Sequence, residues 1–129
     1  MNRMDIYVGA RRSGKTATLI KKSAETGAYI LVATKHQAHA VYKQAKEMEY
    51  DIPFPVTVSE IITGLKYFND SYIKKYGLLI DELQSVLDVA FCGIPIHGAT
   101  LNLDSNTDIK YLNPDERIRA VDESEQKWT

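Results

Sequence analysis

The segment Gly9–Thr16, with the sequence GARRSGKT, spaces two glycines, a lysine and a threonine as a phosphate-binding loop requires. A loop that turns its backbone N–H groups toward an anion needs positive φ, which Gly9 and Gly14 adopt at little cost. Lys15 supplies a cation for the outer phosphates, and Thr16 supplies a hydroxyl ligand for Mg²⁺. The loop therefore predicts binding of a nucleoside triphosphate with magnesium.

Such a loop must join a buried strand to the start of a helix. Residues 4–8 form a short apolar run suited to a strand, and residues 15–25 have helical spacing of apolar side chains before a stop at Gly27. The helix N-terminus then directs its positive dipole at the anion. The alternative is a glycine-containing turn with an incidental lysine, which would require neither the strand nor the helix.

Asp81 and Glu82 are the second pair of residues that could do chemistry. They end the apolar run 77–80, and ligands of open α/β sheets bind at the carboxyl ends of the strands. We expect Asp81 to hold Mg²⁺ together with Thr16, and Glu82 to orient and deprotonate an attacking water. The alternative is that both acids only cap the following helix through its dipole.

Arg11 and Arg12 place two cations inside the loop. One of them could stabilise transition-state charge or contact nucleic acid, and both could also be solvated loop tips. Residues 1–76 hold twelve Lys and Arg against seven Asp and Glu, whereas residues 77–129 hold four against ten. This asymmetry permits contact with a polyanion through the first part, although solvated helix surfaces give the same counts.

The remaining chain alternates between strand-like and helical segments. The sequence predicts strands at 28–33, 56–58 and 94–100, and helices at 35–50, after an N-cap at Ser59, after a cap at Asn69 or Asp70, and from Leu83 to Ala90. Such alternation predicts an α/β fold of three layers with a mainly parallel sheet, because parallel neighbours need crossover helices. Residues 1–112 are expected to form one minimal nucleotide-binding domain, followed by a polar helical tail at 113–129.

Composition limits the class of protein. The chain has 129 residues, of which 44% are hydrophobic, enough for the core of a single domain. One cysteine, Cys92, excludes an internal disulfide and a four-cysteine zinc site, which fits a reducing cytoplasm. No secretory signal or membrane-length apolar run is evident.

The loop GARRSGKT, the strand LLIDE and the run Asp81-Glu82-Leu83-Gln84 together resemble the P-loop ATPases with an additional catalytic glutamate. Helicases and phage DNA-packaging motors belong to that group. The resemblance implies a P-loop NTPase fold, ATP and Mg²⁺ as ligands, and a DNA transaction in a phage or mobile element. It implies that Glu82 polarises water, that Gln84 contacts the γ-phosphate, and that Thr100 senses it from a strand between the loop strand and the Asp81 strand. A chain this short would need an oligomer or a protein partner for translocation.

Two alternatives remain. Thymidine kinases of the compact type also resemble this chain in Ser13–Thr16 and in the order Asp81, Glu82, Gln84, but their zinc-binding lasso needs more cysteines than Cys92. An ATP-binding module that hydrolyses slowly or not at all is the other. The predicted catalytic residues are Lys15 and Glu82, the metal ligands are Thr16 and Asp81, and the nucleotide-binding residues are Gly9, Ala10, Arg11, Arg12, Ser13, Gly14, Lys15, Thr16, Asp81 and Gln84.

Overall fold

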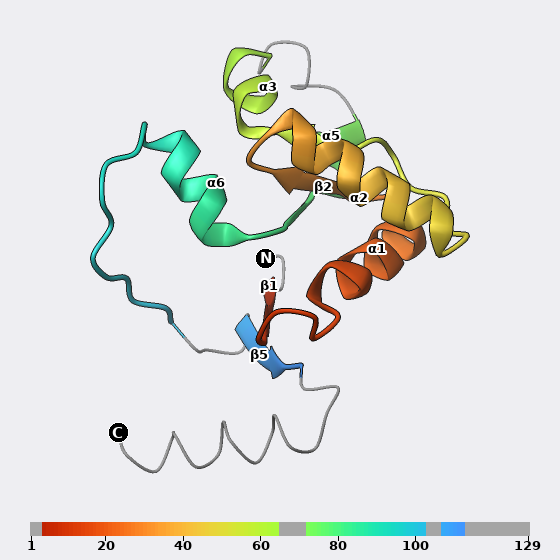
Figure 1. Ribbon diagram of the computed structural model, residues 1–129, viewed down its shortest axis with the longest axis horizontal. Coiled ribbons are helices and arrows are strands. Elements are labelled where there is room, and N and C mark those ends of the chain that lie inside the picture. The colour runs from red at the N-terminus through yellow and green to blue at the C-terminus, as the bar shows by residue number, and fades with distance from the viewer. Residues whose placement is uncertain (1–3, 65–71, 103–106, 113–129) are drawn as a thin grey trace. The chain divides into compact units, whose positions relative to one another are not determined.

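The computed structural model describes residues 4–64, 72–102 and 107–112 (Figure 1). These residues form two compact units, which divide the chain after Lys15 and again before Thr100. One unit contains the described residues of 1–15 and 100–129, and the other contains those of 16–99. The predicted tail at 113–129 and the predicted cap at Asn69 or Asp70 lie outside the described residues.

The first unit contains a parallel pair of strands. β1 (Met4–Val8) pairs along its whole length with β5 (Thr107–Tyr111), from Met4 opposite Thr107 to Val8 opposite Tyr111. The Lys110 ammonium lies 3.4 Å from the Asp5 carboxylate across this pair. The amide of Leu112 donates to the carbonyl of Val8 and extends the ladder to the point where the glycine loop begins. The strand expected at 4–8 is confirmed.

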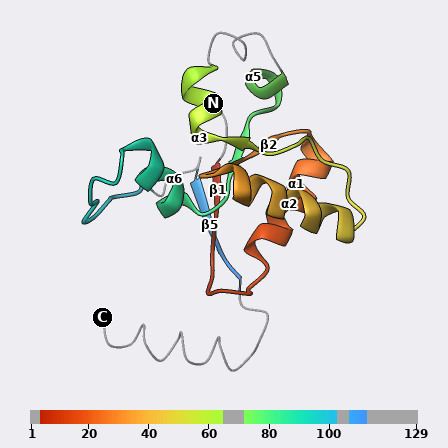
Figure 2. The ribbon, with the colours of Figure 1, turned by 45° about the horizontal axis from the view of Figure 1, so that its top comes forward.

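The second unit contains a three-stranded parallel sheet in the order β3-β2-β4 (Figure 2). Its strands are β2 (Tyr29–Val32), β3 (Val56–Thr57) and β4 (Leu78–Ile80). The central strand β2 is buried on both faces: Ile30 and Val32 are 0% and 1% exposed, and Leu31, on the other face by strand alternation, is 7% exposed. β4 is an edge strand of this sheet, and Leu78 and Ile80, which share one of its faces, are exposed.

Helices connect these strands and cover the sheet. They are α1 (Lys15–Thr26), α2 (Lys35–Glu47), α3 (Val58–Thr63), α5 (Tyr72–Tyr76) and α6 (Leu83–Ala90). One core cluster joins β2 and β3 to α3, α5 and α6 through Leu31, Ala33, Val56, Val58, Ile73 and Val86. Gly27 ends α1 with φ +83°, as its position in the sequence predicts. The described chain is therefore of mixed α/β type with parallel strand pairing.

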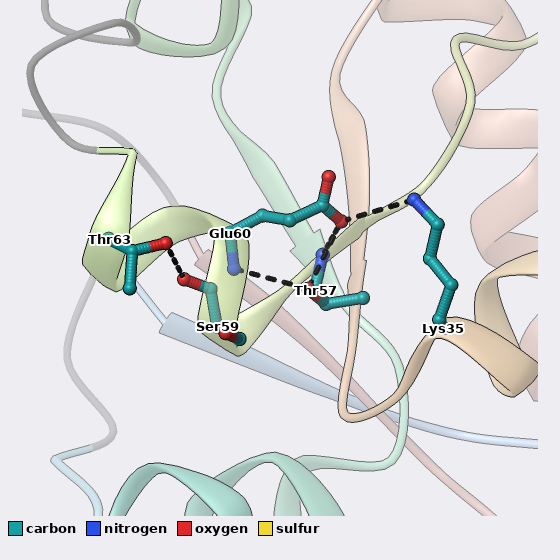
Figure 3. Close-up of polar contacts among 5 residues, drawn as sticks. All are labelled: Lys35, Thr57, Ser59, Glu60 and Thr63. Atoms are coloured by element: carbon teal, nitrogen blue, oxygen red, sulfur yellow. Dashed lines mark hydrogen bonds and ion pairs between the residues drawn. The ribbon is translucent and has the colours of Figure 1, made fainter.

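The N-cap of α3 corrects one expectation. Thr57, not Ser59, caps this helix, because its hydroxyl accepts from the Glu60 amide at 3.2 Å. The Glu60 carboxylate accepts in turn from the Thr57 amide at 3.1 Å, which completes a capping box (Figure 3). The same carboxylate oxygen lies 3.6 Å from the Lys35 ammonium, so the box also meets the first turn of α2.

The strand expected at 94–100 is the second correction. These residues have no regular secondary structure and all are exposed, including Ile94 and Ile96 at 63% and 50%. The strand that pairs with β1 is instead β5, residues 107–111. An apolar run records where a strand would bury its side chains, and it does not specify a pairing partner.

Candidate functional site

Gly9 occupies a position that no larger residue fits. A Cβ there would lie 2.4 Å from the Ser13 hydroxyl oxygen and 2.6 Å from the Leu112 carbonyl oxygen. Gly14 has open space around it, but its φ of +87° strains any residue with a side chain. The two glycines are therefore required for different reasons, one for close approach and the other for backbone conformation.

The Lys15 side chain folds back over the loop that precedes it. Its ammonium donates to the carbonyl oxygens of Gly9 and Ala10, each at 2.8 Å. These bonds hold the charge at the loop and leave one of its three N–H donors for another acceptor. The position of this cation is thus fixed by the first two residues of the motif.

Ser13 and the two arginines contrast in their exposure. Ser13 is 8% exposed, and its hydroxyl has no hydrogen-bond partner among the described residues. Arg11 and Arg12 are both exposed, and Arg12 has a left-handed backbone with φ +62°. A buried hydroxyl without a partner has a free-energy cost that a bound polar ligand would offset.

Within the second unit, Thr16 in the first turn of α1 contacts Asp81, which follows β4. The Thr16 hydroxyl lies 3.3 Å from both carboxylate oxygens of Asp81, although the two residues are 65 positions apart. This distance exceeds the usual 2.7–2.8 Å of O–H···O bonds, so the bond is weak. The structure thus brings together the two residues predicted to share a metal.

Asp81 is held in place by the sheet. Its amide donates to the Leu31 carbonyl at 3.0 Å, which continues the β2–β4 ladder one residue beyond β4. Its side chain is buried, with a residue exposure of 9%. A buried carboxylate on a rigid strand end, facing a hydroxyl, is a suitable pair of hard oxygen ligands.

Glu82 occupies the N-cap position of α6 but does not cap it. Its side chain makes no capping hydrogen bond and is exposed, and its backbone is left-handed, with φ +58° and ψ +69°. A non-glycine residue in this conformation is strained, and such strain clusters at functional sites. The Glu82 side chain therefore provides no hydrogen-bonded cap for α6.

Gln84 and Thr100 differ in what surrounds them. Gln84 lines an open depression with Thr34, Gln37 and Ser85, between the start of α2 and the first turns of α6. Thr100 lies in the exposed segment after α6, and the strand that was to position it is absent from the described residues. The sensor role expected for Thr100 thus loses its structural basis.

Within residues 4–64, 72–102 and 107–112, no group of three or more His, Cys, Asp and Glu side chains could hold a metal ion. No helix in these ranges is long and apolar enough to cross a membrane. Comparisons with protein-family models, with curated proteins and with solved structures found no match.

Proposed function

We propose that this chain is a small P-loop ATPase that binds Mg²⁺–ATP and hydrolyses it. The observation that carries the proposal is the contact between the Thr16 hydroxyl and the Asp81 carboxylate at 3.3 Å. If the GxxxxGKT match were a coincidence, its threonine would not be expected to contact an aspartate 65 residues away at the end of a parallel strand. The three-layer P-loop fold is part of this proposal, supported by parallel pairing throughout the described strands.

The loop supplies the phosphate site in this proposal. Its tight approach at Gly9 and its positive φ at Gly14 suit a backbone that curves around an anion, and α1 begins at the end of the loop. Lys15 can direct its remaining donor at the β- and γ-phosphates while the Gly9 and Ala10 carbonyls hold it. The buried Ser13 hydroxyl is a further polar group that could contact the nucleotide.

Thr16 and Asp81 fit magnesium by their chemistry. Mg²⁺ prefers oxygen ligands and retains several waters, so that one or two protein ligands plus phosphate oxygens complete its shell. A hydroxyl and a carboxylate that already face each other through a weak bond need little rearrangement to accept it. When bound, the ion would neutralise charge developing on the phosphate oxygens.

Glu82 follows the metal carboxylate directly and is our candidate for the general base. Its exposed side chain makes no capping bond, so it is available to a water molecule. It would take a proton from water as the oxygen attacks the γ-phosphorus and the bond to the bridging oxygen breaks, releasing ADP and phosphate. A DNA-linked role, in packaging, unwinding, replication or recombination, is proposed from the exposed Arg11 and Arg12 in the loop.

Phosphate release from ATP, measured with purified chain and Mg²⁺, tests the proposal. Loss of both turnover and ATP affinity in Lys15→Ala would support the proposal, because the lysine is expected to bind the phosphates in the ground state and in the transition state. Transfer of phosphate to thymidine would instead support the kinase alternative, and nucleotide-dependent stabilisation without turnover would support a binding module. Unchanged ATP affinity in Lys15→Ala would contradict all three functions.

A further inference from the structure

The helix α5 (Tyr72–Tyr76) presents two stacked tyrosines to solvent, and nothing in the proposed ATPase site uses them. Tyr72 and Tyr76 have ring centroids 6.0 Å apart and ring planes inclined by 26°. They are 65% and 43% exposed. Single exposed aromatic residues are common on protein surfaces. Two tyrosines stacked on each other, with the Tyr72 ring exposed, form a flat aromatic surface on which a further ring can stack.

The stack is held rigidly from below. Ile73, between the tyrosines in sequence, is 9% exposed and belongs to the core cluster that contains Leu31 and Val86. The Tyr76 ring lies against Gly27, where an added Cβ would come within 3.3 Å of two ring carbons. α5, the short green helix labelled in Figure 2, therefore presents its rings without the entropic cost of ordering a flexible loop.

The helix α5 itself carries positively charged side chains. α5 has the sequence YIKKY, with two lysines and no carboxylate. The Lys75 ammonium lies 5.2 Å from the Tyr76 ring centroid, which keeps the cation next to the aromatic surface. Flat aromatic faces beside a cation suit the bases and phosphates of a single-stranded nucleic acid.

We propose that α5 binds single-stranded nucleic acid, with a base stacked on Tyr72 and a backbone phosphate near Lys75. Stacking needs only a π-face, so this surface would bind with little sequence preference. In a duplex these faces are stacked against neighbouring base pairs everywhere except at the two ends, so single strands should bind more tightly. The choice of ligand agrees with the proposed DNA-linked role, but the binding itself requires no ATP hydrolysis.

Fluorescence anisotropy with a labelled 20-nucleotide oligothymidylate and a matched duplex tests this inference in the absence of ATP. Tyr72→Ala should weaken single-strand binding by roughly 5- to 150-fold, the loss typical of one stacked base. Tyr72→Phe should bind like the unmodified chain, because the ring is retained. Tyr111→Ala is the matched control, since Tyr111 on β5 is 63% exposed and has no role here. Lys75→Gln should reduce the salt dependence by about 0.7 in log–log slope, the value for one phosphate contact on a single strand.

Three outcomes would overturn the inference: equal affinity of Tyr72→Ala and the unmodified chain, equal affinity for duplex and single strand, or an equal loss in Tyr111→Ala. A change in particle mass with Tyr72→Ala would also overturn it, since Tyr72 would then contact a second copy of the chain. Lys15→Ala separates this inference from the proposed ATPase function. That variant should lose phosphate release and retain oligothymidylate binding.

Discussion

The hydroxyl of Thr16 and the carboxylate of Asp81 meet at 3.3 Å, one at the start of a helix and the other at the end of a strand. The bond is longer than an optimal one. Both groups are oxygen ligands of the kind that Mg²⁺ prefers, so each could bind the ion in place of the other. The two residues should therefore affect metal dependence more than folding.

Asp81→Asn tests that expectation. The amide oxygen can still accept from Thr16 but carries no charge, so the Mg²⁺ concentration for half-maximal ATP turnover should rise at least ten- to a hundredfold, the cost of losing even an outer-shell partner. Thermal unfolding without nucleotide should change little. An unchanged magnesium requirement would remove Asp81 from the metal site, and Asp88→Asn on α6 is a suitable control.

Glu82→Gln should separate binding from turnover. The substitution preserves size and removes the proposed base, so phosphate release should fall by about 10²- to 10⁴-fold, the usual contribution of general acid–base catalysis. ATP affinity, measured by calorimetry, should stay close to that of the unmodified chain. If the variant hydrolyses ATP at the original rate, Glu82 does not activate water.

Arg12, one of the two loop arginines proposed to contact DNA, has a strained backbone. At φ +62° an L-residue costs about 1–2 kcal/mol, which glycine avoids. Arg12→Gly should therefore be more stable to denaturant than Arg12→Ala by about 1 kcal/mol, although glycine gains entropy when unfolded. Arg11→Gly is the control and should give no such gain, since Arg11 is not among the positive-φ residues. Equal stability of the two Arg12 variants would contradict the assignment of strain.

Thr57→Ala should destabilise the chain by about 1–2 kcal/mol through loss of the α3 cap, measured by urea unfolding. Ser59→Ala should have little effect, because its side chain is exposed and the Thr63 hydroxyl bonds only to its carbonyl. ATP affinity should stay unchanged in both variants. The reverse order of stabilities would restore Ser59 as the cap.

Sequence reasoning was most successful where a residue type has few alternatives. Gly27 ends α1, and the strand before the loop and the strand before Asp81 are close to their predicted positions. Both signals, a glycine after a helix and a short apolar run, act locally. The cap at Thr57 could also have been found: Glu60 stands three residues later, as a capping box requires, whereas Ser59 has Ile62 at that spacing.

Long-range pairing could not be predicted in the same way. Residues 94–100 carry an apolar signal as clear as that of β4, yet they are exposed, and the more polar residues 107–111 pair with β1. Strand partners depend on which edges are available in three dimensions, and that information is not local. The left-handed backbone of Glu82 was equally beyond reach, because glutamate rarely adopts it.

The amide of Asp81 still belongs to the hydrogen-bonded ladder, through its bond to the Leu31 carbonyl. Because successive side chains on a strand alternate between faces, one residue inserted between Ile80 and Asp81 would turn the carboxylate away from Thr16 without changing any residue's identity. The distance along the chain from the paired strand to this acid is thus as tightly constrained as the acid itself. A chain that kept the aspartate but shifted it by one position would lose the contact.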